Sequence, residues 1–185
     1  MAFDIITVSP TTVDGAHTAG DLMFDLTSFN LPHRACRLIN VFMEVANGGG
    51  EDDTKIGILF FKKNTTASLG TAGPSGGGGS GTGANIAHAD FTANQYIGQT
   101  FLGLSDGSNL VRDVIDTTAL YYSAHPFSTA GATRGGAGLM EMVLMTDKAG
   151  DNLFTNTMYM GGVVHSGAPD FDGTGNVKIH LHIEH

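Results

Sequence analysis

An alternation of apolar and polar side chains with a period of two runs from Val177 to Glu184. The apolar residues share one side of an extended chain and are Val177, Ile179, Leu181 and Ile183. The polar residues share the other side and are Lys178, His180, His182 and Glu184. A helix would scatter both sets around its axis, whereas a strand keeps them on two faces. This segment is therefore predicted to be a β-strand with one face in a core and the other facing water or a partner.

Residues 36–63 are predicted to form the centre of a sheet. In the run 37–45 one face of an extended chain carries Ile39, Val41, Met43 and Val45. The other face carries Leu38, Asn40, Phe42 and Glu44. A glycine-rich turn at 47–53 leads to a second extended run at 55–62, so the two runs are expected to pair as a β-hairpin. The second run is apolar on both faces, which indicates a central strand whose second face is covered by another subunit or a loop and points to an oligomer.

Further extended runs are predicted at 3–9, 21–29, 96–104, 139–145 and 153–164. The run 109–120 fits both a helix and strands and is assigned to strand. In the run 21–29, Asp21 and Asp25 are expected to face water. No convincing helix is found. The predicted fold is all-β, an antiparallel, jelly-roll-like β-sandwich in a single domain over residues 1–185. The Gly/Ser-rich segment 70–84 is predicted to be a long, mobile surface loop of that domain, because it cannot bury enough apolar area to offset its entropy.

The charge balance limits the kinds of partner. Nine Lys and Arg stand against eighteen Asp and Glu, which gives a formal net charge of -9. Nucleic acids and anionic membranes are therefore not expected as partners, since both are bound through clustered basic residues. Cys36 is the single cysteine, so no intrachain disulfide can form, and a small buried side chain is expected there. The absence of a basic leader and of a run of about 20 apolar residues predicts a soluble protein made in a cytoplasm.

Patterns associated with catalysis occur without their structural context. The G-x-S-x-G pattern appears at 73–77 and 103–107 and would place nucleophilic serines at Ser75 and Ser105. The first lies in the Gly/Ser-rich loop, and the second is not followed by a clear helix. The glycines at 76–81 likewise lack the helix or the Gly-Lys-Ser/Thr ending of a nucleotide site. No catalytic or cofactor-binding residue is predicted, and the chain is expected not to be an enzyme.

Two histidines on one strand face form the clearest possible metal site. His180 and His182 project to the same side, and such His-x-His spacing is used by metal sites in β-barrels. A third ligand would be required, and His165, His125 and Glu184 are the candidates. A polar strand face in water or at a subunit contact is the simpler interpretation, so no metal is predicted.

Calcium is considered at two acidic segments. Residues 170–176 begin like a calcium-binding loop, but the position that requires a bidentate glutamate is Leu181. A turn held by Asx hydrogen bonds explains the segment better. The acidic residues 51–53 are interpreted as a solvated hairpin tip.

A group of aromatic residues allows a carbohydrate-binding interpretation. Tyr121, Tyr122, His125 and Phe127 could stack on sugar rings, although packing in a core or an interface is favoured because the chain has no Trp.

Several segments together resemble a known class of proteins. These are the strand 58–61 followed by Lys62-Lys63-Asn64, the strand start 96–98, the segment 120–122 and the alternating C-terminal strand. They resemble small virion proteins of marine tailed bacteriophages, namely the β-sandwich decoration, or cement, proteins of the capsid. The resemblance implies a structural protein on the outer capsid surface. It also implies a homo-oligomer, expected to be a trimer, that binds the major capsid protein. The alternatives are a carbohydrate-binding or tail-associated receptor module, and a cupin-like metal protein that uses His180 and His182.

Overall fold

The computed structural model describes residues 2–46, 54–74, 86–102, 118–122, 142–146, 155–171 and 175–185. Its elements, in chain order, are β1 (Phe3–Val8), β2 (Gly15–Ala16), β3 (Leu22–Asn30), β4 (Ala35–Ala46), β5 (Lys55–Phe61), α1 (His88–Ala93), β6 (Tyr96–Leu102), β7 (Thr118–Tyr122), β8 (Met142–Met145), β9 (Thr157–Ser166), β10 (Asp170–Phe171) and β11 (Val177–Glu184).

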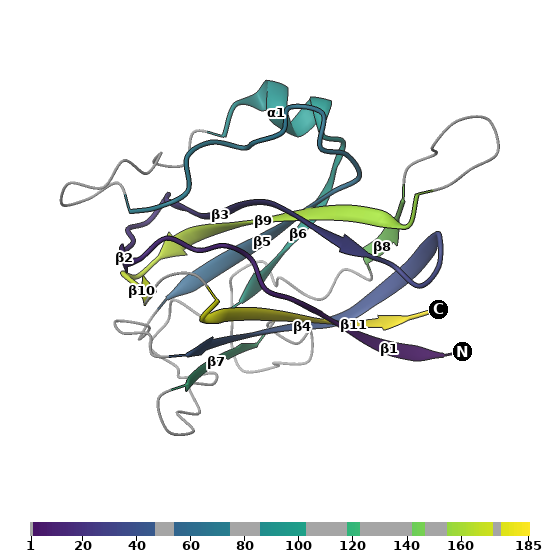
Figure 1. Cartoon of the computed structure of the whole chain (residues 1–185), viewed down its shortest axis with the longest axis horizontal. Coiled ribbons are helices and arrows are strands. Elements are labelled where there is room, and N and C mark those ends of the chain that lie inside the picture. The colour runs from purple at the N-terminus through teal and green to yellow at the C-terminus, as the bar shows by residue number, and fades with distance from the viewer. Residues whose placement is uncertain are drawn as a thin grey trace, which may run out of the picture.

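Two antiparallel sheets pack face to face (Figure 1). The first sheet has the strand order β1-β11-β4-β7, and β8 pairs with the other end of β4. The second sheet has the order β3-β9-β5-β6, and β2 and β10 form a small separate ribbon. Every pairing is antiparallel. The predicted all-β antiparallel sandwich is confirmed.

The main core lies between the two sheets and contains residues of both. The apolar side chains of β11 are completely buried there, as the alternation in the sequence predicts. Cys36 is also buried, with 3% of its surface exposed, and its thiol contacts the carbonyl oxygen of His33. Burial raises the pKa of the Cys36 thiol, which keeps it protonated and unreactive.

The predicted hairpin of residues 36–63 is wrong. β4 lies in the first sheet between β11 on one edge and β7 and β8 on the other, whereas β5 lies in the second sheet between β9 and β6. Each strand is central, as expected, but in a different sheet. Both edges of each strand are already hydrogen-bonded to other partners, so the chain crosses from one sheet to the other between them.

A bulge in β4 moves Leu38 to the core side. His182 pairs with Asn40 and Ile183 pairs with Leu38, so Ile39 is an extra residue in β4. Two residues then oppose one, which resets the alternation. Leu38 is 2% exposed and belongs to the main core, in contrast to the prediction that it shares a face with Asn40 and Glu44.

Asp21 was expected to face water and is instead fully buried just before β3. Its carboxylate accepts hydrogen bonds from the backbone N–H of Thr18 at 2.7 Å and from the Thr18 hydroxyl at 3.1 Å. These bonds satisfy a carboxylate that would otherwise be costly to bury. The pairing of β3 with β9 shifts register twice within Leu22–Thr27, which explains why Leu22, Met23 and Phe24 are all buried.

The second face of β5 is covered by the chain itself. Leu59 and Phe61 belong to a separate apolar cluster with Leu69 from the segment after β5, and Phe91 of α1 packs against it. Figure 1 shows α1 and this segment over the outer face of the second sheet. A loop was one of the two covers predicted for this face, and the short helix α1 was not predicted. The apolar second face of β5 therefore no longer indicates an oligomer.

Two adjacent glycines of β9 make room for side chains from both sides. A Cβ at Gly162 would lie 2.2 Å from the ring of Phe24, and one at Gly161 would lie 2.6 Å from Leu69. Phe24 belongs to the main core and Leu69 to the second cluster. Glycine is thus required here by the close approach of two side chains to the strand backbone.

The predicted loop 70–84 begins as part of the packed structure. The N–H of Gly73 donates to the carbonyl of Leu22 at 2.9 Å, and Ala72 packs against the second cluster. Residues 75–84 lie outside the described residues, as do most of the run 109–120 and the acidic segment 51–53. None of the described helices is long and apolar enough to cross a membrane.

Candidate functional site

The polar side of β11 lies in the middle of the outer face of the first sheet. β11 is flanked by β1 and β4, and His180 pairs across the strands with Thr7 on one side and Phe42 on the other. Lys178 likewise lies opposite Glu44. The strict alternation of β11 places these side chains outside, while its apolar residues fill the core.

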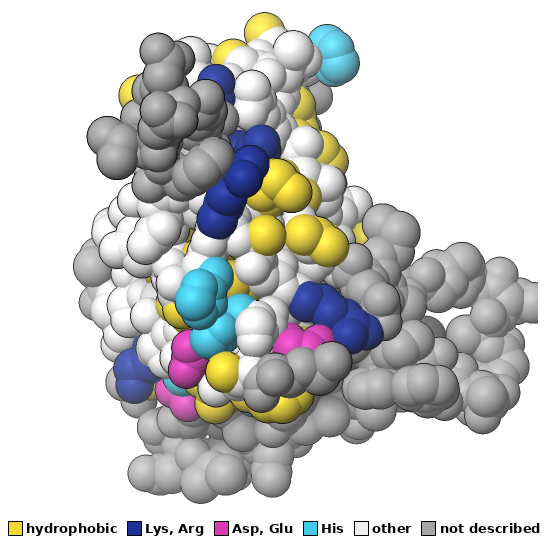
Figure 2. Space-filling view, turned by 90° about the vertical axis from the view of Figure 1, so that its right-hand side faces the viewer, with side chains coloured by type: hydrophobic (Ala, Val, Ile, Leu, Met, Phe, Trp, Pro, Cys, Tyr) yellow, Lys and Arg dark blue, Asp and Glu magenta, His cyan; other side chains and the backbone are white. Residues whose placement is uncertain are grey.

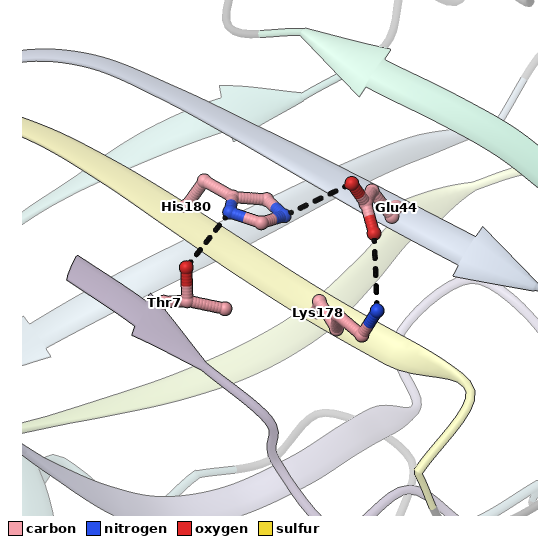
Figure 3. A network of polar contacts seen from close by, with 4 residues as sticks. All are labelled: Thr7, Glu44, Lys178 and His180. Atoms are coloured by element: carbon pink, nitrogen blue, oxygen red, sulfur yellow. Dashed lines mark hydrogen bonds and ion pairs between the residues drawn. The ribbon is translucent and has the colours of Figure 1, made fainter. Parts of the chain in front are cut away.

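Four of these side chains form a chain of contacts that we call the polar ladder: Thr7, His180, Glu44 and Lys178 (Figure 3). The Thr7 hydroxyl lies 3.0 Å from Nδ1 of His180. Nε2 of His180 lies 3.3 Å from one carboxylate oxygen of Glu44, whose other oxygen lies 3.6 Å from Nζ of Lys178. The ladder thus ties β1, β11 and β4 together across the outer face of the first sheet.

The ring of Phe42 contacts both histidines of β11. Its ring stacks on that of His180 at 4.2 Å with an interplanar angle of 12°, and meets His182 edge-on at 5.4 Å. Nε2 of His182 is buried and has no hydrogen-bond partner among the described residues. Burial, and after it the neighbouring His180, lower the pKa of His182 from its usual value of 6.5. His182 is therefore held as the neutral form at neutral pH.

The order hydroxyl, imidazole, carboxylate in the polar ladder is also that of a hydrolytic triad. In such a triad, the imidazole is oriented by hydrogen bonds to both neighbours. Nε2 of His180 approaches Glu44 without forming a hydrogen bond. Thr7 lies in a regular strand directly opposite His180, rather than on a turn that would expose its hydroxyl to a substrate. The ladder is a cross-strand contact of a sheet surface.

Neither of the two described candidates for a third metal ligand, His165 and Glu184, completes a metal site with His180 and His182. His165 lies in β9 of the other sheet, where its ring meets Phe101 at 4.8 Å. Glu184 is paired with Arg37 at 2.9 Å. Among the residues that the structure describes, no three His, Cys, Asp or Glu side chains are placed to hold a metal ion, and His125 lies outside them.

A second group of histidines lies where the two ends of the described chain meet. Nε2 of His185 contacts the Asp4 carboxylate at 2.8 Å, and its ring lies 4.4 Å from that of His33. Figure 2 shows histidine side chains beside acidic ones on this side of the molecule. These contacts fix the start of β1 to the end of β11.

His17 is a buried histidine that the sequence did not single out. It is fully buried beside the β2–β10 ribbon, where Nδ1 contacts the Gly15 carbonyl at 2.8 Å and the ring packs edge-on against Phe171. Nε2 has no partner among the described groups. Burial lowers the pKa of His17, against the smaller opposing effects of the Gly15 carbonyl, Asp21 and Asp170. A lone histidine in a segment of small and polar residues gives no sequence signal of burial.

The remaining predicted segments are only partly described. Asp170 begins β10 and pairs with Ala16, whereas residues 172–174 of the possible calcium loop lie outside the described part. The backbone of Tyr121 and Tyr122 forms part of β7, opposite Met43 and Phe42 of β4. Residues 103–107, 125 and 127, and the serine at 75, also lie outside the described ranges. The described residues therefore bear neither on the two serine patterns, for which no catalytic role is predicted, nor on the carbohydrate-binding alternative.

No family model matches the chain, and no curated protein is significantly similar to it. Its function is therefore inferred from the geometry of its faces.

Large apolar side chains flank the polar centre of the outer face. Phe3 and Ile5 of β1 are 66% and 62% exposed, and Val143 of β8 is 53% exposed. Phe3, Glu184, Arg37 and Val143 stand in one cross-strand row over β1, β11, β4 and β8. The ion pair of Arg37 and Glu184 thus lies between two exposed apolar groups. The sequence shows the apolar residues but not that they face outwards in one row.

Proposed function

We propose that this chain is a structural protein of a phage virion, a decoration or cement protein that binds the major capsid protein on the outer surface of the shell. The observation that carries the proposal is the row of exposed apolar side chains on both sides of an ion pair. Exposed large apolar side chains that gather on one face of a soluble protein are typical of a protein interaction site, and the charges of Arg37 and Glu184 between them are already paired. The resemblance of the strand pattern to capsid decoration proteins supports the same proposal.

The mechanism is adhesive. A protein that binds two neighbouring capsid subunits at once adds its binding free energy to the intact shell, and this free energy is lost when the shell ruptures. Such work requires rigid apolar and backbone contacts and no catalytic residue. Copies of the chain are proposed to associate with one another on the shell, with a trimer as the expected form.

The connectivity of the sandwich is proposed to be that of a jelly roll. The strand orders β1-β11-β4-β7 and β3-β9-β5-β6 support this proposal, because the successive strands β1, β3, β4 and β5 alternate between the two sheets. Jelly rolls occur in capsid, lectin and cupin proteins, so the connectivity alone does not choose among the functions considered above.

The proposal is tested with capsids that are prepared with and without the protein. We expect decorated capsids to release their DNA at a higher temperature and to survive osmotic shock better than undecorated ones. Val143→Glu should weaken binding to emptied shells about tenfold or more, because it places a charge in the apolar row. Val13→Glu is the matched control, since Val13 is 40% exposed and lies outside the strands. Equal resistance of decorated and undecorated capsids would refute the cement function.

A further inference from the structure

The strand β1 is an open edge of the first sheet. It pairs over its whole length with β11, and none of the other described strands pairs with its second edge. An unpaired edge presents backbone N–H and C=O groups that can bind another extended chain.

The hydrogen bonds at the start of β1 show which groups face the open edge. The N–H of Ala2 donates to the His185 carbonyl at 2.9 Å, and the N–H of His185 donates to the Ala2 carbonyl at 3.0 Å. Antiparallel ladders alternate between pairs that exchange such bonds and pairs that do not. The even-numbered residues of β1 therefore bond to β11. The backbone groups of Phe3, Ile5 and Thr7 point away from the sheet.

The side chains of β1 offer little protection against pairing. Natural edges are blunted by lysine, proline, bulges, inward-pointing charged residues or a covering loop. β1 contains neither lysine nor proline, and its register with β11 is regular throughout. Its single charged residue, Asp4, contacts His185, so its carboxylate is directed along the existing sheet. Phe3 and Ile5 leave more than half of their surface exposed.

The corresponding edge of the second sheet is blunted in two of these ways. β3 shifts register twice against β9. The segment after β5 also covers it, since Gly73 donates to the Leu22 carbonyl at 2.9 Å and Leu69 donates to the Asp25 carboxylate at 2.7 Å. Within the described residues, the chain thus covers one sheet edge and leaves the edge of β1 uncovered.

We propose that β1 pairs antiparallel with β1 of a second copy about a two-fold axis at Ile5, so that the first sheets of two molecules become one continuous sheet. This contact is distinct from the expected trimer and does not depend on binding to a capsid.

The composition of β1 is self-complementary in this register. Ile5 lies opposite the Ile5 of the second copy and Phe3 lies opposite Thr7, so all three outward-facing backbone positions find a partner. Apolar side chains meet across the axis, and Asp4 lies opposite Ile6 rather than opposite another carboxylate. A register centred on Asp4 would leave Thr7 without a strand partner and would place two carboxylates side by side.

The first test is the mass of the full-length protein in solution, measured by light scattering, for the wild type and for Ile5→Pro. Proline removes an N–H that faces the open edge and leaves the bonds to β11 in place. We expect the wild type to form an oligomer with an even number of copies. This oligomer is a dimer or, if trimers also form, a hexamer. Ile5→Pro should halve that mass and weaken the pairing about 100-fold, since the axis residue occurs twice in the contact. A wild-type monomer or trimer, or a wild-type mass that Ile5→Pro leaves unchanged, would overturn the proposal.

Two lysine variants provide a second test that does not depend on the folding of Ile5→Pro. Ile5→Lys should also halve the mass, whereas Val13→Lys should not change it. Circular dichroism and the thermal midpoint of each variant establish that it is folded. Unchanged dimers of folded Ile5→Lys would contradict pairing at this edge.

The register is tested by cross-linking single-cysteine substitutions under mild oxidation. Cys36 is buried, so each variant carries one accessible thiol. In the proposed register the Cα atoms at position 5 are about 5.5 Å apart, which a disulfide can span. Those at position 3 are four residues apart, or about 13 Å. We expect Ile5→Cys to give covalent dimers at least about tenfold faster than the similarly exposed Phe3→Cys. Equal rates would contradict the register.

Discussion

The pKa of a buried residue differs between the folded and the unfolded protein, because its surroundings differ. His17 is fully buried, and burial is the largest cause that lowers its pKa, although Asp21 and Asp170 oppose it. The native state therefore binds a proton at His17 less readily than the unfolded state does. Stability that depends on neutral His17 is present above the unfolded pKa of 6.5 and is lost as the pH falls through the lowered native pKa.

This difference predicts a pH dependence that one substitution should reduce. His17→Asn keeps an N–H that can donate to the Gly15 carbonyl and does not titrate. The free energy of unfolding of the wild type should fall between pH 7 and pH 5, by about 1.4 kcal/mol for each unit by which the pKa of His17 is lowered. The fall should be smaller in His17→Asn. Urea unfolding at a series of pH values measures both, and parallel curves would show that His17 does not titrate in this range.

At the scale of elements, the packing of β9 depends on two positions that carry no side chain, Gly161 and Gly162. Gly161 and Gly162 let Leu69 and Phe24 approach the backbone of one strand from opposite sides. The second face of β9 thus receives the segment that follows β5, while its first face receives the main core. At these two glycines, β9 contributes no side chain to either apolar cluster.

Gly162→Ala should therefore destabilise the protein by about 1 to 3 kcal/mol, because the new methyl group would overlap the Phe24 ring. Gly98→Ala is the control, since its Cβ would meet the flexible end of Met142 at 3.0 Å. The additional substitution Phe24→Leu should recover part of the loss, which a double-mutant cycle detects. Equal unfolding midpoints for Gly162→Ala and the wild type would contradict this packing.

At the scale of the whole molecule, the chain covers its own sheets unevenly. The second sheet is closed by α1 and by the segment that contains Leu69. The first sheet leaves apolar side chains of β1 and β8 exposed. Within the described residues, one face of the sandwich is thus covered by the chain itself, whereas the other keeps large apolar side chains exposed. Folding of the monomer should not require an oligomer.

Leu69→Ala tests this division. Because Leu69 is 4% exposed and packs on Gly161, its truncation should cost about 2 to 4 kcal/mol without changing the mass in solution. Chemical denaturation and light scattering measure the two quantities, and Val13→Ala serves as the exposed control. A change in mass with no loss of stability would mean that this face is an intermolecular contact.

The sequence predicted the features that depend on neighbouring residues and missed those that depend on distant ones. The alternation of β11 and the central positions of β4 and β5 could be predicted because a strand of period two reveals its own faces. The sheet to which each strand belongs could not, since β4 and β5 choose partners far away in the chain. The extra residue Ile39 likewise changes the face of Leu38 without any local signal. In the candidate site, the position of His180 on the polar face of its strand was expected. Its stacking on Phe42 could not be predicted, because it depends on the register between β11 and β4.

The position of β11 has a consequence for the order in which the protein can be made. Among the described strands it is the last to leave the ribosome, yet it lies between β1 and β4, near the other end of the chain. β1 therefore has no partner in its sheet until β11 has been synthesised, after the other described strands. During that time its apolar strand is available to neighbouring nascent chains on the same messenger RNA. Folding is thus expected to be slow, because the first sheet cannot form until strands from distant parts of the chain have paired.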